Sequence, residues 1–456
     1  MSNSFKELVT LISEQIIKVE ERKRSRTEQE KISFTYALTH LLKDLWLNSK
    51  TLPPQHSVIS KRSNNYSNNN RYVDPLLSYR NIISAFNGLI SLQLIEVTEE
   101  GFYDRVRMQG KLTRFVATDE LKEQLLLLNG HPVFMFKQPQ NDETIILRNE
   151  VEGRNAKIEY EDTADTLMWR KELSIINNCL FRHWADLRIL DSEIPVLSER
   201  LEYDNSKLPI NFASRTLTRI FTNGSFSEGG RFYRGWWQNV PSEYRPYITL
   251  NEHVTQEHDY SQLSPNMIYF MEGKELGNED AYDRILNGEH RKTCKQAFNA
   301  MIQASTSLRR KPDKLNIDHI DMSWIDLRQR VLDTHKPIEH LFFSGVGNRM
   351  QFEDSCIASN VMLQFASNNE PILPIHDSFI MRSNFSGELE EAMRRAFHDR
   401  FKKDIPIKSE LLVTQEPLFN SDGLPRTKEV VADDRKHSQW YDRKTMWLYY
   451  KDNQEE

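Results

Sequence analysis

The chain has 456 residues, enough for two or three domains, and a formal net charge of -6 at pH 7. This acidic balance excludes a protein coated in basic charge for nucleic acid but allows a local basic channel. No apolar run approaches a membrane span, and three distant cysteines indicate neither a disulfide framework nor a zinc site. Residues 1–26 lack a signal-peptide core, so we expect a cytoplasmic protein without membrane contact.

Residues 1–125 are predicted to form a mainly helical N-terminal domain. Apolar residues recur at helical spacing twice within residues 5–48 and again over 79–92. Strand-like runs follow at 94–97 and 112–117. Helices that lead into a two-stranded ribbon resemble a winged helix-turn-helix, in which helix 79–92 would read a DNA groove.

Several basic residues of this domain are candidates for nucleic-acid binding. They are Arg80 on the helix and Arg105, Arg107, Lys111 and Arg114 on the ribbon. The alternative is a docking domain whose basic residues are only solvated. Residues 126–210 are then predicted to be connective, with a small sheet over 133–157 and a helical run over 164–190.

Residues 226–238 combine glycines with arginines and aromatic residues. Glycine permits close approach of another backbone, and arginines among aromatic rings can stack on bases or clamp phosphates. Arg231, Tyr233 and Arg234 are therefore candidate nucleic-acid contacts. The alternative is a glycine turn that leads into two core tryptophans.

Two separated carboxylates are expected at the ends of strands. Asp259 follows a strand-like segment, and Pro265 suits the first turn of the next helix, which predicts Asp259 at a corner beyond the sheet edge. Asp377 lies between two short apolar runs, which indicate a β-hairpin with Asp377 at its tip. Such a pair is what two-metal phosphoryl transfer requires. For Asp259, a turn-forming or capping role is the alternative.

A basic helix is predicted between the two carboxylates. Residues 291–303 have a helical period, and Arg291 and Lys295 fall one turn apart on the same face. Two cations on a rigid helix suit a nucleotide triphosphate, although a solvated surface pair is the alternative. The order of carboxylate, basic helix and hairpin carboxylate is more specific than any one of its parts.

These segments resemble the motifs of the superfamily of family A DNA polymerases and phage-type single-subunit RNA polymerases. Residues 259–263 (DYSQL) look like motif A, and Arg291 with Lys295 looks like the start of the motif B helix. Residues 376–379 (HDSF) look like motif C of the RNA polymerases, and 230–233 (GRFY) look like a template-strand segment of theirs. The resemblance covers roughly residues 215–415 and is that of a compact, divergent member.

The resemblance implies an α+β fold with a right-hand polymerase palm and fingers, built as an antiparallel sheet with helices, over residues 211–420. The winged-helix-like domain would precede it, residues 126–210 would supply thumb-like helices, and 421–456 would be a polar tail. The aromatic residues at 440, 441, 447 and 449 indicate that part of this tail docks.

The resemblance also implies roles for individual residues. Asp259 and Asp377 would bind two Mg²⁺ ions, with Mn²⁺ as a substitute, and Arg291 and Lys295 would neutralise the triphosphate. His376 would orient the primer end, and Gln351 would touch the primer–template. The remaining nucleotide contacts would be Tyr260, Ser264, Asn299 and Gln303.

Two departures from the motifs bear on the substrate. Ser264 stands where the DNA polymerases carry a glutamate that excludes ribose, so NTPs are favoured. Asn299 and Gln303 stand where motif B carries larger, in part aromatic residues. We therefore expect a primase or RNA-polymerase-like enzyme on a DNA template or primer–template, in replication of a phage, plasmid or mobile element. The alternatives are a DNA polymerase that uses dNTPs, a DNA-binding replication or regulatory protein on an inactive polymerase fold, and a nuclease with the same metal pair.

Overall fold

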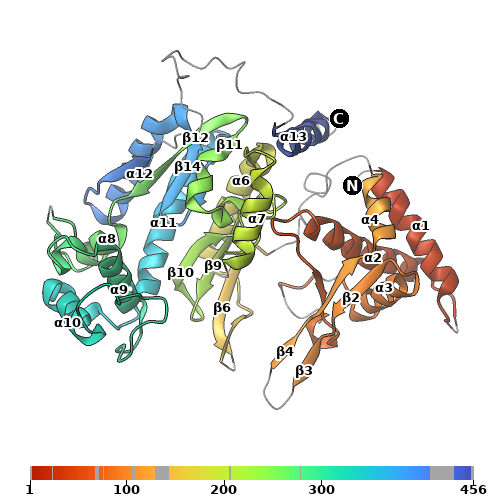
Figure 1. Ribbon diagram of the computed structural model, residues 1–456, viewed down its shortest axis with the longest axis horizontal. Helices are drawn as coiled ribbons and strands as arrows, with labels where there is room; N and C mark the ends of the chain where they lie inside the picture. The colour runs from red at the N-terminus through yellow and green to blue at the C-terminus, as the bar shows by residue number, and fades with distance from the viewer. Residues whose placement is uncertain are drawn as a thin grey trace.

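The helices and strands of the computed structural model pack around two hydrophobic cores in the described part of the chain. One core draws on residues 5–125 and the other on residues 145–447. Figure 1 shows the two units side by side, with the N-terminal unit in red and orange. The structure describes residues 3–22, 24–66, 71–74, 76–104, 109–128, 143–151, 153–204, 207–277, 279–410 and 436–452.

The N-terminal unit contains the expected helices and a small antiparallel sheet of order β1-β5-β2. Its helices are α1 (Asn3–Val19), α2 (Glu28–Asn48), η1 (Ser63–Tyr66), α3 (Tyr79–Ser91) and α4 (Asp119–Leu126). Its strands are β1 (Ser57–Ile59), β2 (Ile95–Glu99), β3 (Phe102–Asp104), β4 (Gln109–Lys111) and β5 (Thr113–Ala117). Helix α2 begins at a capping box in which Thr27 and Glu30 satisfy each other's backbone N–H. The sequence patterns had not indicated β1 and α4.

The second unit begins with a four-stranded sheet of order β10-β9-β6-β7. Its strands are β6 (Ile145–Val151), β7 (Arg154–Lys157), β9 (Thr218–Thr222) and β10 (Ser225–Tyr233). The β6–β9 pair is parallel, which departs from the all-antiparallel sheet that we expected. Since β6 comes from the segment predicted to be connective, that segment shares a sheet with the following region.

The central sheet is antiparallel and has the order β13-β14-β12-β11-β8, with β15 also paired to β12. Its strands are β8 (Ala185–Leu187), β11 (Ile248–Leu250), β12 (His253–Tyr260), β13 (Leu373–Ile375), β14 (Ser378–Arg382) and β15 (Ile407–Glu410). Strand β12 therefore has partners on both edges. This sheet brings together segments that lie far apart in the sequence and holds both predicted carboxylates.

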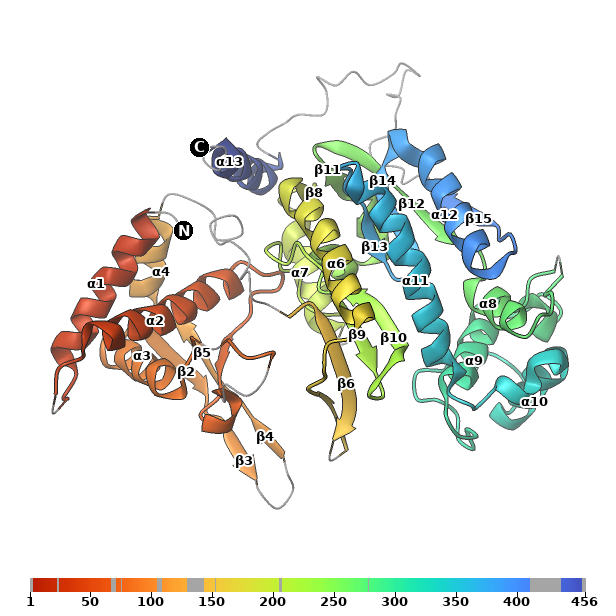
Figure 2. The same ribbon diagram turned by 180° about the vertical axis from the view of Figure 1, so that it is seen from behind.

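Helices surround these sheets. They are α6 (Ala164–Arg182), α7 (Glu193–Tyr203), α8 (Leu263–Met271), α9 (Arg291–Gln303), α10 (Trp324–Thr334), α11 (Val346–Ser367), α12 (Ser386–Phe401) and α13 (Ser438–Asp452). Three of them carry predicted site residues: Ser264 on α8, Arg291, Lys295, Asn299 and Gln303 on α9, and Gln351 on α11. Short 3₁₀ turns are η2 (Trp236–Asn239), η3 (Ser242–Tyr247), η4 (Asp283–Ile285), η5 (Lys336–Leu341) and η6 (Ser383–Phe385). Figure 2 shows the long helix α11 running past β10 and α6 toward α9. In the described part of the chain, no helix has the length and apolarity that crossing a bilayer needs.

Helix α13 docks onto the second unit through buried contacts. Arg443 makes two 2.8 Å hydrogen bonds to the carboxylate of Asp186 on β8, and both side chains are buried. Trp440 and Trp447 pack against Trp184, whereas Tyr449 is exposed. The described end of the predicted tail is thus part of the core, and residues 421–435 lie outside the described residues.

Candidate active site

The two predicted carboxylates lie at neighbouring positions of the central sheet. Asp259 is the penultimate residue of β12 and pairs with Ser378 of β14 on one side and Lys408 of β15 on the other. This corrects the expectation that Asp259 would stand beyond the sheet edge, because β15 continues the pairing to Tyr260. The sequence around β15 had given no strand signal.

Asp377 occupies the turn of the predicted β-hairpin. Ile375 of β13 pairs with Ser378 of β14, so His376 and Asp377 form a two-residue connection. His376 has a φ of 57°, which is the left-handed conformation that two-residue hairpin turns need at their first central position. Because Ser378 is the cross-strand partner of Asp259, this turn places Asp377 beside Asp259.

The two carboxylates interact electrostatically, and among the described residues neither has an ion-pair partner. Partial exclusion of water by the surrounding protein, followed by the negative charge of Asp377, raises the pKa of Asp259 to about 7. Glu257 adds to this rise, while the cations Lys295 and Lys408 oppose it. In the described part of the chain, neither carboxylate accepts a hydrogen bond or forms an ion pair. The site therefore keeps two adjacent acidic groups whose joint ionisation is unfavourable without a cation.

This donor set suits a hard divalent cation. Carboxylate oxygens are the ligands that Mg²⁺ uses, and a polymerase-type Mg²⁺ takes only one or two of them because substrate phosphates and water complete its coordination. Within the described residues, no group of three or more His, Cys, Asp or Glu side chains is placed to hold a metal ion by itself. Asp259 and Asp377 fit a metal that shares its coordination with a substrate.

Helix α9 carries the predicted basic pair, and its two cations differ. Lys295 is exposed, forms no ion pair with a described residue, and lowers the pKa of Asp259 by its charge. Arg291 forms an ion pair with Asp280 at 2.7 Å. Lys295 is thus free to meet a ligand beside the carboxylates, whereas Arg291 has to leave Asp280 first.

The loop that holds Asp280 is anchored to the segment at residues 259–263. The side-chain oxygen of Gln262 accepts a 2.6 Å hydrogen bond from the backbone N–H of Ala281. Tyr282 is buried, and the charges of Asp377 and Asp259 contribute to the rise in its pKa, after burial and the Asp280 charge. The loop therefore lies beside helix α9 and near enough to the carboxylate pair to interact with it electrostatically, a placement that the loop-like sequence did not reveal.

Gln303 and Gln351 lie together on the same side of the site as Asn299. The side-chain amide of Gln351 on α11 donates a 3.2 Å hydrogen bond to the side-chain oxygen of Gln303 on α9. Gln303 also lies against Gly347, where an added Cβ would come within 2.5 Å of the glutamine side chain. Asn299, one turn earlier on α9, is half-buried.

Arg231 is held by a buried carboxylate that sequence reasoning missed. Its Nε lies 2.7 Å from the Oδ2 of Asp354 on α11, and Asp354 is almost fully buried. Burial raises the pKa of Asp354 to about 6, although Arg231 counteracts this, and Asp377 adds to the rise. Gly230, with a φ of 79°, makes the approach feasible, because an added Cβ would lie 2.9 Å from the Ser355 hydroxyl.

The other predicted nucleotide and primer residues differ in their accessibility. His376 is exposed and stacks edge-on with Tyr233 at a centroid distance of 5.8 Å. Partial exclusion of water by the neighbouring protein and the Arg231 charge lower the pKa of His376 to about 4, which favours the neutral ring at pH 7. Ser264 is half-buried in the first turn of α8. Tyr260 is buried and donates a hydrogen bond to the Met393 carbonyl, so its side chain belongs to the core.

The predicted nucleic-acid residues of the N-terminal unit lie away from this site. Arg80 is exposed on α3. Lys111 and Arg114 are exposed but share the carboxylate of Glu99, at 2.8 and 3.5 Å. Arg105 and Arg107 lie outside the described residues. In the second unit, the predicted nucleic-acid contact Arg234 is exposed beyond the end of β10, with a φ of 86°.

Three acidic or basic neighbours of the carboxylate pair were not predicted. Glu257 precedes Asp259 by two residues on the same strand and therefore shares its face, a signal that strand periodicity offers. Its Oε1 accepts a 2.5 Å hydrogen bond from the Ser378 hydroxyl and lies 3.0 Å from Arg245. Lys408 and Asp354 come from distant segments, and only the folded chain brings them here.

Comparisons with known proteins give little support to any assignment. No family model matches the chain, and no curated protein matches it. A solved structure that is similar is the POL domain of Pol1 from M. smegmatis, in complex with DNA primer-template and dNTP. It is 12% identical with a TM-score of 0.31, over 48% of this chain and 50% of that one. The chain thus spans about half the length of that domain, and a likeness of this size carries no argument about function.

Proposed function

We propose that the protein is a template-directed nucleotidyltransferase that joins nucleotides on a DNA template. The observation that supports this most is a pair of carboxylates without an ion-pair partner among the described residues: Asp259 on β12, and Asp377 in the turn that leads into the neighbouring strand β14. Lys295 approaches this pair from a separate helix. Nucleotide transfer needs both halves of this arrangement, because it requires oxygen ligands for cations and a positive charge for the triphosphate.

Asp259 and Asp377 would hold two Mg²⁺ ions together with the substrate phosphates. When bound, these ions supply the positive charge that stabilises the attacking and leaving oxygens of the transfer. Lys295 would bind the phosphates from the α9 side, and Arg291 would join it by exchanging Asp280 for a phosphate oxygen. Both residues neutralise charge and fix the triphosphate in position, which are the main sources of rate in phosphoryl transfer.

Polar residues further along α9, on α11 and on the hairpin turn would contact the strands. Gln351 and Gln303, joined by their hydrogen bond, present side-chain amides from two helices. Neutral His376, on the hairpin turn beside Asp377, would accept or donate one hydrogen bond to the primer end without repelling the metal ions. Ser264 leaves room for a 2′-hydroxyl, which favours NTPs.

The experiment that tests this function is nucleotide incorporation with Mg²⁺ on single-stranded DNA. It is run with and without a primer, and with NTPs or dNTPs supplied separately. We expect product from NTPs that is lost in both Asp259→Ala and Asp377→Ala. Product from dNTPs alone would retain the transferase and overturn the sugar preference. Absence of product under every condition, with DNA binding retained, would favour the binding protein on an inactive fold.

A further inference from the structure

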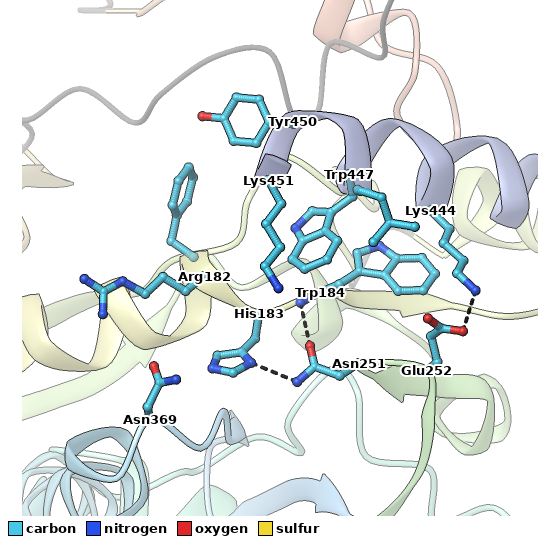
Figure 3. A pocket seen from close by; sticks show the side chains of 12 residues that line it. Arg182, His183, Trp184, Asn251, Glu252, Asn369, Lys444, Trp447, Tyr450 and Lys451 are labelled. Atoms are coloured by element: carbon cyan, nitrogen blue, oxygen red, sulfur yellow. Dashed lines mark hydrogen bonds and ion pairs between the residues drawn. The ribbon is translucent and has the colours of Figure 1, made fainter. Parts of the chain in front are cut away.

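A pocket away from the carboxylate pair lies where α13 covers the end of α6 and the turn between β11 and β12. Its volume is about 650 Å³, within the range of small-molecule sites. Figure 3 shows Lys451 and Trp447 reaching down from α13, with Arg182 and Asn369 at one side. His183 and Asn251 lie beneath them. None of these residues belongs to the proposed transferase site.

The pocket is separated from the carboxylate pair by the length of a strand. Strand β12 begins at His253, next to the pocket, and reaches Asp259 six residues later. At a rise of about 3.3 Å per residue, the two sites are roughly 20 Å apart. One nucleotide therefore cannot occupy both sites, and a ligand here is additional to the substrate at the carboxylate pair.

The charges that line the pocket favour an anion. Lys444 is neutralised by an ion pair with Glu252. Arg182 and Lys451 are exposed and have no carboxylate partner among the described residues, so their two positive charges remain for a ligand. Guanidinium and ammonium groups bind phosphate through charge-assisted hydrogen bonds.

The size and aromatic lining of the pocket favour a ligand larger than a simple phosphate. Half-buried rings of Phe181 and Tyr450 line the same space as the two cations. Trp447, in contrast, is buried and has the Lys451 ammonium over its ring at 5.4 Å. Aromatic rings next to basic side chains bind the bases of nucleotides by stacking, while the cations contact the phosphates. The exposed side-chain amide of Asn369 supplies a donor and an acceptor for the edge of a base.

The floor of the pocket is fixed by hydrogen bonds that also leave one donor unused. Asn251 accepts a 3.0 Å hydrogen bond from the Trp184 backbone N–H, so its amide nitrogen is the donor to Nδ1 of His183 at 2.8 Å. The neutral His183 ring therefore carries its proton on Nε2, which is buried without a partner among the described residues. The Arg443–Asp186 pair fixes the helix that forms the roof. The site is thus preformed.

We infer that this pocket binds a nucleoside phosphate, with its base among the aromatic rings and its phosphates on Arg182 and Lys451. The same chemistry is offered by a free nucleotide and by an unpaired nucleotide of a strand. Either source would place a nucleotide at the opposite end of β12 from the carboxylate pair.

The test is binding of a fluorescent ATP analogue to the full chain carrying Asp377→Ala, in EDTA, so that metal-dependent binding at the transferase site is removed. We expect the double variant Arg182→Gln/Lys451→Gln to bind at least about tenfold more weakly, since two charged hydrogen bonds are lost. Lys171→Gln, an exposed change on the same α6 helix, is the matched control and should leave binding unchanged. All three changes are at exposed positions, and melting curves check that folding is retained.

Competitors and crosslinks decide the ligand and its place. Displacement by ATP identifies a free nucleotide, and stronger displacement by a short single-stranded DNA identifies a strand end. Photocrosslinking with an azido-ATP should label peptides that contain residues 181–184 or 444–451. Equal displacement by inorganic tripolyphosphate, labelling confined to α9, or unchanged affinity in the double variant would each overturn the inference.

Discussion

Two aspartates near Asp377 differ in how their charge is balanced: Asp354 belongs to an ion pair, and Asp259 faces another carboxylate. Asp354 is buried and holds Arg231 at 2.7 Å, so its negative charge has a partner. Asp259 is exposed beside Asp377, and neither carboxylate has a partner among the described residues. Removing one partner of the buried Asp354–Arg231 ion pair would destabilise the protein, because the other charge would stay buried alone. The repulsion between Asp259 and Asp377 instead destabilises the folded protein while it is present.

This difference separates a structural charge from a functional one. The Asp354–Arg231 pair fixes α11 against β10, and each charge is satisfied within the protein. The Asp259–Asp377 pair leaves an unfavourable interaction that only a bound cation would relieve. Electrostatic repulsion that remains uncompensated in a rigid part of a fold is typical of sites that bind ligands or perform chemistry. Substitutions in the Asp259–Asp377 pair should therefore lower activity without lowering stability. Substitutions in the Asp354–Arg231 pair should lower stability.

The largest expected effect is the loss of transfer in Asp377→Ala. Removing one of two metal-binding carboxylates should lower nucleotide incorporation by at least about 10³-fold, because the charge at the reacting oxygens is no longer neutralised. The melting temperature should stay the same or rise, since repulsion of Asp259 disappears. Asp399→Asn, an exposed aspartate on α12, is the control and should keep full activity. A fully active Asp377→Ala would remove the distinction between the two pairs.

The second effect is on stability and concerns Asp354→Asn. This change leaves Arg231 without its counter-charge, and we expect a loss of about 2 kcal/mol in the free energy of unfolding. The value lies below that of a fully buried pair because a quarter of the Arg231 side chain is exposed. Urea unfolding measures the change.

The neighbouring residue supplies a matched control for that measurement. Glu353 pairs with Arg400 nearer the surface, so Glu353→Gln should cost less than about 1 kcal/mol. Equal destabilisation by Asp354→Asn and Glu353→Gln would show that burial does not distinguish these two ion pairs.

Local sequence patterns predicted the parts of this region that depend on neighbouring residues. The hairpin at Asp377 was visible because apolar runs flank a polar pair, and helix α9 was visible because its apolar residues recur with a helical period. The partners of these residues were not visible. Lys408 reaches Asp259 through a strand without a clear signal, and Asp354 looks like any polar residue of a helix until α11 packs on β10. Pairing between distant segments is a property of the fold, which a local pattern does not contain.

The smallest expected effect is on the pH dependence of stability, and it follows from the raised pKa of Asp259. In the folded protein this pKa is about 7, above the value of about 4 in an unfolded chain. Between these pH values the unfolded chain has released a proton that the folded protein still holds. The contribution of Asp259 to stability is therefore present below pH 4 and is lost as the pH rises through 7.

Unfolding by urea in EDTA at pH 5 and pH 8 tests this sign. Asp259→Asn has no proton to lose at this position, so its stability should fall less between pH 5 and pH 8 than that of the unmodified protein. We expect the two losses to differ by under about 1 kcal/mol, because the side chain is exposed to solvent. The contribution of Asp354 to the pH dependence of stability is the same in both proteins and cancels in the comparison. Mg²⁺ added at pH 8 should stabilise the unmodified protein and not Asp259→Asn, since a cation that binds both carboxylates removes their repulsion. The same pH dependence in both proteins would mean that Asp259 ionises normally beside Asp377, and the contrast between the Asp354–Arg231 ion pair and the Asp259–Asp377 pair would then rest on burial alone.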